Sequence, residues 1–139
     1  QKLVVIAPKD HELSGKTSVN LLEAAKYPQV GFEANTGLRA IVDKMYRDVG
    51  VSARYIIEER EDYAVAGMVA IGFGIAVVPR LAILEQLDVS CLEIENDNNY
   101  RTFYLTYAKN GNLTSAERRF IDFARAEVAE HDLANAEVS

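Results

Sequence analysis

Residues 29–50 read QVGFEANTGLRAIVDKMYRDVG: a short apolar run, a small polar turn, and then a long helical pattern. Six apolar residues of the second half recur at helical spacing and so share one face: Leu38, Ile41, Val42, Met45, Tyr46 and Val49. Thr36 suits the N-cap of this helix, and Gly50 suits the glycine position just beyond its end. We therefore predict a strand over residues 29–33, a turn, and a helix that begins after Thr36.

Strand and helix patterns alternate on both sides of this stretch. Continuous apolar, β-branched runs at residues 3–7 (LVVIA) and 74–78 (GIAVV) predict strands buried on both faces. Asp62 is expected to cap a helix, and Pro79 to lie in the first turn of a short one. The remaining expected elements are strands over residues 54–58, 90–94 and 101–107, helices over residues 20–26, 63–71 and 114–130, and turns at 95–99 and 110–111. This alternation predicts an α/β fold: a mostly parallel sheet with helices on both faces.

Length and composition limit the class of protein. The chain has 139 residues, about the size of one domain, and a formal net charge of −6. An acidic chain without a Lys/Arg run argues against a phosphate-binding surface, because affinity for nucleic acid rests on basic residues. No apolar run approaches the length of a membrane-spanning helix, so we expect no membrane contact. Cys91 is alone and is expected to be a small buried hydrophobe.

The sequence contains few signatures of an enzyme or of a cofactor site. The sequence contains no G-x-S-x-G, no Walker loop and no H-E-x-x-H, and we expect no cofactor and no metal. His11 and His131 have no partner at ligand spacing. Four carboxylates lie close together in residues 58–62, EERED, but acid/base catalysis needs two in one water-poor site. We expect a solvated acidic loop there.

Two loops should follow strands and lead into helices, at residues 33–37 and 58–62. In such sheets ligands bind at the carboxyl ends of strands. The junction of Thr36 and Gly37 would place free backbone N–H groups at a helix N-terminus, which favours anions. Arg39 and Arg60 would add positive charge or a bidentate grip on a carboxylate. The residues alone leave two readings open: a ligand site, or an N-cap beside two surface arginines.

The order of several pieces resembles a known family. The most specific are VVIAPKDHEL, the glycine-flanked VAIGFGIAVVPR, and the final YLTYAKNGNLTSAERRFIDF. In this order and spacing, they resemble the effector-binding region of LysR-type transcriptional regulators over nearly the whole chain. The resemblance implies a fold like one subdomain of a type II periplasmic binding protein.

The same resemblance implies an organisation within a single domain of residues 1–139. Residues 1–8 would be a first crossover strand, 9–100 the second regulatory subdomain, 101–108 the return crossover, and 114–130 a C-terminal helix. The winged helix-turn-helix DNA-binding domain and most of the first subdomain are expected to lie outside this chain. The last helix would then lack its usual partner, so we expect it to pack differently or to mediate self-association.

The resemblance also places the effector, a small and anionic metabolite, in the cleft between the two subdomains. The contacts carried over to this sequence are Ala34, Asn35, Thr36, Gly37, Arg60 and Glu61. Pro8 and Lys9 are weaker candidates. The expected partners are this effector and further copies of the regulator, with DNA reached only through the separate domain, in the cytoplasm.

Three other readings stay open at this point. A solute-binding protein of a transport system has the same two-lobed architecture. An enzyme on this fold would use Glu58 or Glu61 as acid or base. An interaction module would carry these loops as inert surface.

Overall fold

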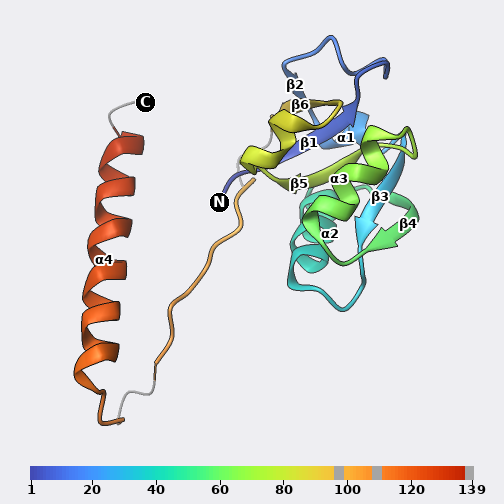
Figure 1. Ribbon diagram of the computed structural model, residues 1–139. Coiled ribbons are helices and arrows are strands. Elements are labelled where there is room, and N and C mark those ends of the chain that lie inside the picture. The colour runs from blue at the N-terminus through green and yellow to red at the C-terminus, as the bar shows by residue number, and fades with distance from the viewer. Residues whose placement is uncertain (96–98, 108–110, 137–139) are drawn as a thin grey trace. The chain divides into compact units, whose positions relative to one another are not determined.

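The computed structural model describes residues 1–95, 99–107 and 111–136, with side chains as far as residue 129. The chain forms two compact units, residues 1–103 and 104–139. The first unit contains β1 (Leu3–Pro8), β2 (Ser18–Val19), α1 (Leu21–Ala24), β3 (Pro28–Phe32), α2 (Gly37–Asp48), β4 (Arg54–Glu59), α3 (Asp62–Ala70), β5 (Ala76–Pro79), a 3₁₀ helix (Ala82–Gln86) and β6 (Val89–Ile94) (Figure 1). The second contains α4 (Ser115–Ala136).

The strands of the first unit form a mixed sheet. Four pair in the order β2-β6-β1-β5, and β3 pairs with β4. A parallel bridge between Gln29 and Ile75 joins the two groups beside β5. Strand β1 runs antiparallel to β5 and β6, whereas the β2–β6 and β3–β4 pairs are parallel. Among the described strands β1 therefore runs against the other five, and the predicted mostly parallel α/β sheet is confirmed.

This direction of the strands brings four carboxyl ends to one edge of the sheet. The carboxyl ends of β3, β4, β5 and β6 point to the edge at which β1 begins. The chain steps from β3 outward to β4 and then back past β3 to β5. Because such crossovers are right-handed, steps in opposite directions put α2 and α3 on opposite faces of the sheet. Both helices begin at the carboxyl edge.

The core lies on either side of β1. All six residues of β1 are buried, because β5 and β6 flank it and α3 packs across the sheet. On the other face Leu38, Val42, Met45 and Tyr46 of α2 are buried. The other two residues of the predicted apolar stripe, Ile41 and Val49, are partly buried against the core. Burial on both faces accounts for the continuous apolar runs of the central strands.

The ends of α2 follow the predicted caps. Thr36 is the N-cap, and its hydroxyl accepts a hydrogen bond from the amide of Arg39 over 3.2 Å. Gly50 has a φ of 80°, the left-handed conformation that glycine adopts most readily after a helix. The helix thus begins and ends where its local sequence predicts.

Three local predictions were wrong. Asp62 is the first residue of α3, so it lies inside the helix, and Glu61 occupies the N-cap position without a side-chain cap hydrogen bond. Pro79 is the last residue of β5, where the strand pairing does not require the backbone N–H that proline lacks. The short helix begins later, at Ala82. Residues 101–107 form no strand: Arg101 donates its amide to the carbonyl of Gln1 over 2.7 Å, and residues 102–107 are exposed without a ladder in the described chain.

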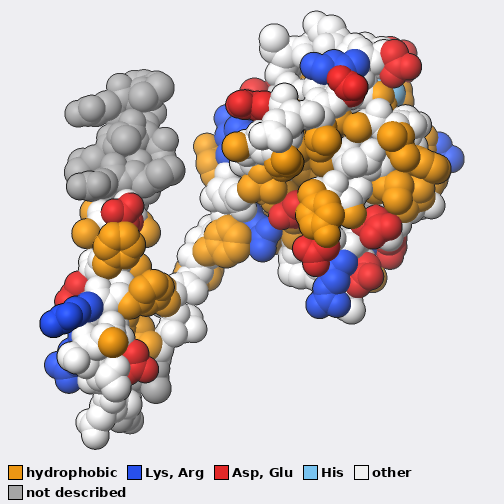
Figure 2. All heavy atoms as spheres, in the orientation of Figure 1, with side chains coloured by type: hydrophobic (Ala, Val, Ile, Leu, Met, Phe, Trp, Pro, Cys, Tyr) orange, Lys and Arg blue, Asp and Glu red, His pale blue; other side chains and the backbone are white. Residues whose placement is uncertain are grey.

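The second unit is built around α4. The predicted capping box is present: the Thr114 amide donates to Glu117 Oε2 over 2.7 Å, and the Glu117 amide donates to Thr114 Oγ1 over 3.3 Å. The helix extends beyond residue 130, to Ala136. Ile121 is buried, whereas Phe120, Phe123 and Val128 are exposed, and Figure 2 shows hydrophobic side chains along α4.

The predicted turns at residues 95–99 and 110–111 fall mostly outside the described residues. In the part of the chain that is described, no helix has both the length and the apolar character needed to span a membrane.

Candidate functional site

The two loops singled out in the sequence lie next to each other. Strands β3 and β4 are parallel neighbours, with Phe32 opposite Glu59 at their carboxyl ends. One residue further, the amide of Glu33 donates to the carbonyl of Glu59 over 3.0 Å. The structure therefore brings together all six predicted contact residues: Ala34, Asn35, Thr36 and Gly37 from the β3–α2 junction, and Arg60 and Glu61 from the β4–α3 junction.

The β3–α2 loop is held in shape by Thr36. The carbonyl of Glu33 accepts hydrogen bonds from the Thr36 amide, over 3.0 Å, and from its hydroxyl, over 2.8 Å. Ala34, Asn35 and Gly37 are exposed. The amides of Gly37 and Leu38 have no hydrogen-bond partner within the described residues. Two backbone donors thus remain available at the positive end of α2.

The β4–α3 loop carries both signs of charge. Arg60 is exposed and makes no ion pair with any described side chain, and Glu61 beside it is exposed as well. Burial raises the pKa of Asp62; the positive charge of Arg101 opposes this shift, and the negative charge of Glu61 adds to it. Figure 2 shows acidic side chains gathered on the part of the first unit where α2, α3 and β4 lie in Figure 1.

Arg39 does not provide the ligand grip that its position suggested. Its side chain is only 14% exposed and forms ion pairs with Asp43, at 3.0 Å, and Glu58, at 2.8 Å. It also donates to the carbonyl of Phe32 over 2.6 Å. Burial acts to lower the pKa of Arg39, but the hydrogen bond with Glu58 and the charge of Asp43 outweigh it, and the pKa is raised. The Nε and Nη1 atoms of Arg39 are therefore occupied within the protein.

Catalysis by the acidic loop has little structural support. Glu58 is exposed and engaged by Arg39, and Glu61 is exposed as the N-cap of α3. They do not form the water-poor carboxylate pair that acid/base chemistry requires. The described residues also contain no cluster of His, Cys, Asp or Glu suited to a metal ion.

The weaker candidates Pro8 and Lys9 lie at the wrong edge of the sheet. Pro8 is buried and pairs with Val89, the first residue of β6. Since β1 is antiparallel to β6, its end lies at the edge where the parallel strands begin. Pro8 and Lys9 are thus separated by the length of the sheet from the β3–α2 loop. The sequence did not reveal this separation, because it does not show that β1 runs against its neighbours.

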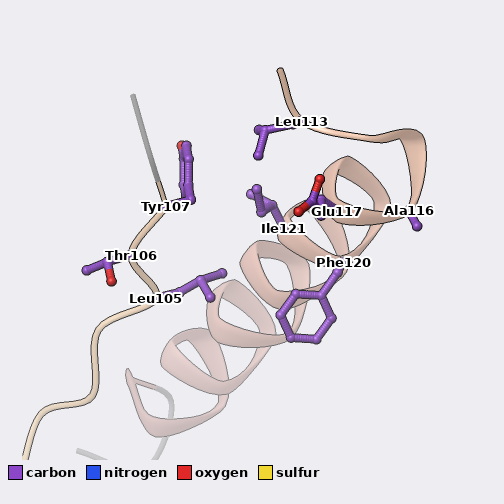
Figure 3. Close-up of a pocket in the computed structure, with 8 residues that line it drawn as sticks. All are labelled: Leu105, Thr106, Tyr107, Leu113, Ala116, Glu117, Phe120 and Ile121. Atoms are coloured by element: carbon purple, nitrogen blue, oxygen red, sulfur yellow. The ribbon is translucent and has the colours of Figure 1, made fainter. Parts of the chain in front are cut away.

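The second unit has a hollow of its own, of about 360 Å³. Figure 3 shows Leu105 pointing toward α4 and Thr106 pointing away from it. The lining is mainly apolar, and its one carboxylate, Glu117, already accepts the cap hydrogen bonds of Thr114. This hollow lacks the convergent free polar groups of a metabolite site.

Comparison with protein families settles what kind of domain this is. The model of the LysR substrate binding domain matches residues 1–129. The chain belongs to this LysR family. The resemblance of the motifs is thereby confirmed.

Two curated relatives of this LysR domain are transcriptional regulators. The chain is similar to the RuBisCO operon transcriptional regulator of Allochromatium vinosum, with 31% identity over 130 residues, covering 91% of this chain and 43% of that protein. It is similar to the HTH-type transcriptional regulator YybE of Bacillus subtilis (strain 168), with 25% identity, covering 94% of this chain and 44% of that protein. The chain thus spans less than half the length of these relatives.

A solved structure supports the same fold for the LysR domain. The effector-binding domain of QuiR, in complex with shikimate, superposes with a TM-score of 0.88 at 29% identity, covering 94% of this chain and 63% of that one. The predicted fold like a subdomain of type II periplasmic binding proteins is confirmed.

Several residues around these two loops escaped prediction. Tyr55 lies under Arg39, with the guanidinium carbon 3.8 Å from its ring centroid, and donates its hydroxyl to Asp43 Oδ1 over 2.8 Å. Arg101 stacks on Phe103, with 4.4 Å between guanidinium carbon and ring centroid. Its positive charge also acts to lower the pKa of Asp62. No local motif marks these residues; only the i, i+4 spacing of Arg39 and Asp43 was readable.

Proposed function

We propose that this chain is the effector-sensing part of a LysR-type transcriptional regulator. The effector is a small anionic metabolite, bound at Ala34, Asn35, Thr36, Gly37, Arg60 and Glu61. The cleft is closed by a first subdomain outside this chain, and occupancy controls DNA binding by a separate winged helix-turn-helix domain. The observation that carries the proposal is the adjacency of the two loops at the carboxyl edge, where Gly37 and Leu38 keep free amides.

The charges of the site favour an effector with both a carboxylate and hydroxyl groups. The free amides of α2 and the unpaired Arg60 supply donors for a carboxylate. Glu61 supplies an acceptor that suits a hydroxyl group and would repel a second anion. Shikimate, the ligand of the QuiR domain, has this combination of groups. We therefore place the effector among hydroxylated carboxylic acids.

Regulation would follow from a difference in affinity. An effector that contacts both subdomains binds their closed arrangement more tightly than the open one, and only that difference shifts the equilibrium. The regulator would act in the cytoplasm as a dimer or tetramer, so a shift within each subunit would change how the oligomer spaces its DNA contacts. A solute-binding protein is less favoured, because the curated relatives described above are regulators.

The test uses the full-length regulator and isothermal titration with shikimate and a panel of other hydroxylated carboxylic acids. Arg60→Gln is expected to weaken the binding of an active acid by about tenfold, because a charge-assisted hydrogen bond is lost. Arg54→Gln is the matched control, since Arg54 is also exposed but is the first residue of β4, at the opposite end of the strand from Arg60. Binding that is indifferent to both Arg60→Gln and Thr36→Val would remove these loops as the effector site.

A further inference from the structure

Arg39 lies at the centre of a network that spans both proposed effector loops. It contacts the Phe32 carbonyl at the end of β3, Asp43 within α2, and Glu58 near the end of β4, over 2.6, 3.0 and 2.8 Å. Phe32 directly precedes the first loop and Glu58 lies two residues before Arg60. One side chain thus ties the base of one loop to the base of the other.

The ring of Tyr55 packs against the guanidinium of Arg39. Its ring lies against Gly31, where a β-carbon would be only 2.3 Å from Tyr55 Cδ1, and Arg39 stacks on the ring. Its hydroxyl binds Asp43 Oδ1, while Asp43 Oδ2 pairs with Arg39. Both carboxylate oxygens of Asp43 are therefore used inside the network. Glycine at position 31 is what gives the ring room to lie here.

The network also sets the direction of α2. Arg39 is the third residue of this helix, and Thr36 caps it through the Arg39 amide. Fixing the Arg39 side chain against β3 and β4 therefore fixes the first turn of the helix, including the free amides of Gly37 and Leu38. A carboxylate bound by such amides loses much of its affinity when donors move by about 1 Å.

We propose that Arg39, supported by Tyr55, is a positioning residue that holds the two effector loops in one binding geometry. We assign it positioning rather than effector contact, because its Nε and Nη1 atoms already bind Asp43, Phe32 and Glu58 and its side chain is only 14% exposed. This inference rests on the proposed function for its consequence in effector affinity, but the positioning itself is a property of the free protein.

Amide hydrogen–deuterium exchange of the full-length regulator without effector tests the positioning. Arg39→Met keeps the aliphatic stem and removes the ion pairs, and Tyr55→Phe keeps the ring and removes the bond to Asp43. We expect the hydrogen-bonded amides of Glu33, Thr36 and Ala40 to exchange about tenfold faster in Arg39→Met and several-fold faster in Tyr55→Phe, with β1 and β5 unchanged. Lys44→Met is the control, because it breaks only the exposed Lys44–Asp48 pair on the same helix.

Two outcomes would overturn the proposal: unchanged exchange at the amides of Glu33, Thr36 and Ala40, or an increase spread equally over β1 and β5, which would show a merely structural role. If Arg39→Met fails to fold, Tyr55→Phe decides alone. Titration with shikimate is a separate arm. Loss of affinity in Tyr55→Phe supports the link to effector binding, whereas failure of wild type and of all panel acids to bind would count against the proposed function only.

Discussion

Gln29 and Tyr46 form a buried polar pair in the core: Gln29 Nε2 donates to the Tyr46 hydroxyl oxygen over 2.6 Å. The same nitrogen donates to the carbonyl of Ala24 over 3.2 Å, so the pair links β3 to α1 and α2. Burial raises the pKa of Tyr46, which stays protonated at all ordinary pH values. This pair joins three elements behind the proposed site.

Removing the hydroxyl should therefore destabilise the fold. We expect Tyr46→Phe to lower the free energy of unfolding by about 1–3 kcal/mol, because the buried Gln29 amide loses a partner. Urea unfolding followed by circular dichroism measures the change. Tyr63→Phe, at an exposed tyrosine of α3, is expected to change little. Equal effects of the two substitutions would contradict a special role for the pair.

A second prediction concerns the close approach of Gly31 to Tyr55. Gly31→Ala should cost about 1–3 kcal/mol in the free energy of unfolding, because a methyl group there overlaps the Tyr55 ring. Gly67→Ala is the matched control: Gly67 lies inside α3 with no atom near its absent β-carbon. There alanine should stabilise the protein by about 0.5–1 kcal/mol. A neutral Gly31→Ala would disprove the packing argument.

The third prediction concerns the N-cap of α2. Thr36→Val should lower the free energy of unfolding by about 1 kcal/mol, because the amide of Arg39 loses its side-chain acceptor. Thr36→Ser keeps the acceptor and should cost only a fraction of this. Thermal unfolding of the two variants side by side measures the difference, and identical melting temperatures would show that the cap contributes nothing.

The fourth prediction concerns acid. Glu93 pairs with Lys2 over 2.5 Å and also with Arg80. The hydrogen bond from Lys2 lowers its pKa, burial opposes this, and Arg80 lowers it further, to below the usual value of 4.5. A carboxylate whose pKa is lowered by folding stabilises the fold at pH values above its unfolded-state pKa. This stabilisation is lost as the pH falls through the folded-state pKa.

Wild type should therefore lose stability more steeply than Glu93→Gln as the pH falls below about 4.5. Urea unfolding at pH 3 and pH 7 compares the two proteins. Because Glu93 is partly exposed, salt should reduce the difference. Parallel pH profiles for the two proteins would show that these ion pairs contribute nothing to folding.

The fifth prediction concerns α4, whose exposed Phe120, Phe123 and Val128 remain the expected surface for self-association. For the chain of residues 1–139, analytical ultracentrifugation should show an oligomer that Phe123→Glu reduces to monomer. Glu127→Lys, a charge change on the same helix, should leave the oligomer intact. A wild-type monomer at high concentration would remove self-association and leave altered packing as the explanation.

Local signals predicted some parts of this structure well. The apolar period of α2, its cap at Thr36 and its glycine at position 50 describe one continuous segment, and neighbours along the chain determine its conformation. The strand predicted over residues 101–107 failed because alternation also suits an extended chain without a partner, and pairing is decided by distant segments. The reversed β1 likewise cannot be read from LVVIA, which looks the same in either direction.

The proposed site shows the same division. Loop positions followed from the order of strands and helices, but the role of Arg39 did not. Its partner Glu58 is 19 residues away and meets it only because β3 and β4 are parallel neighbours. The local sequence does not distinguish an arginine exposed to solvent from one that is mostly buried in an ion-pair network.

The places where the chain enters and leaves the first unit are hydrogen-bonded to each other: Arg101 to Gln1 and Leu3 to Asn99, each over 2.7 Å. Topologically, residues 1–101 are therefore a cassette, with both junctions at one point. In the proposed full-length regulator, a homologous cassette could be exchanged without changing the distance that the flanking chain must bridge. The proposed effector contacts of the two loops would be exchanged together with this cassette.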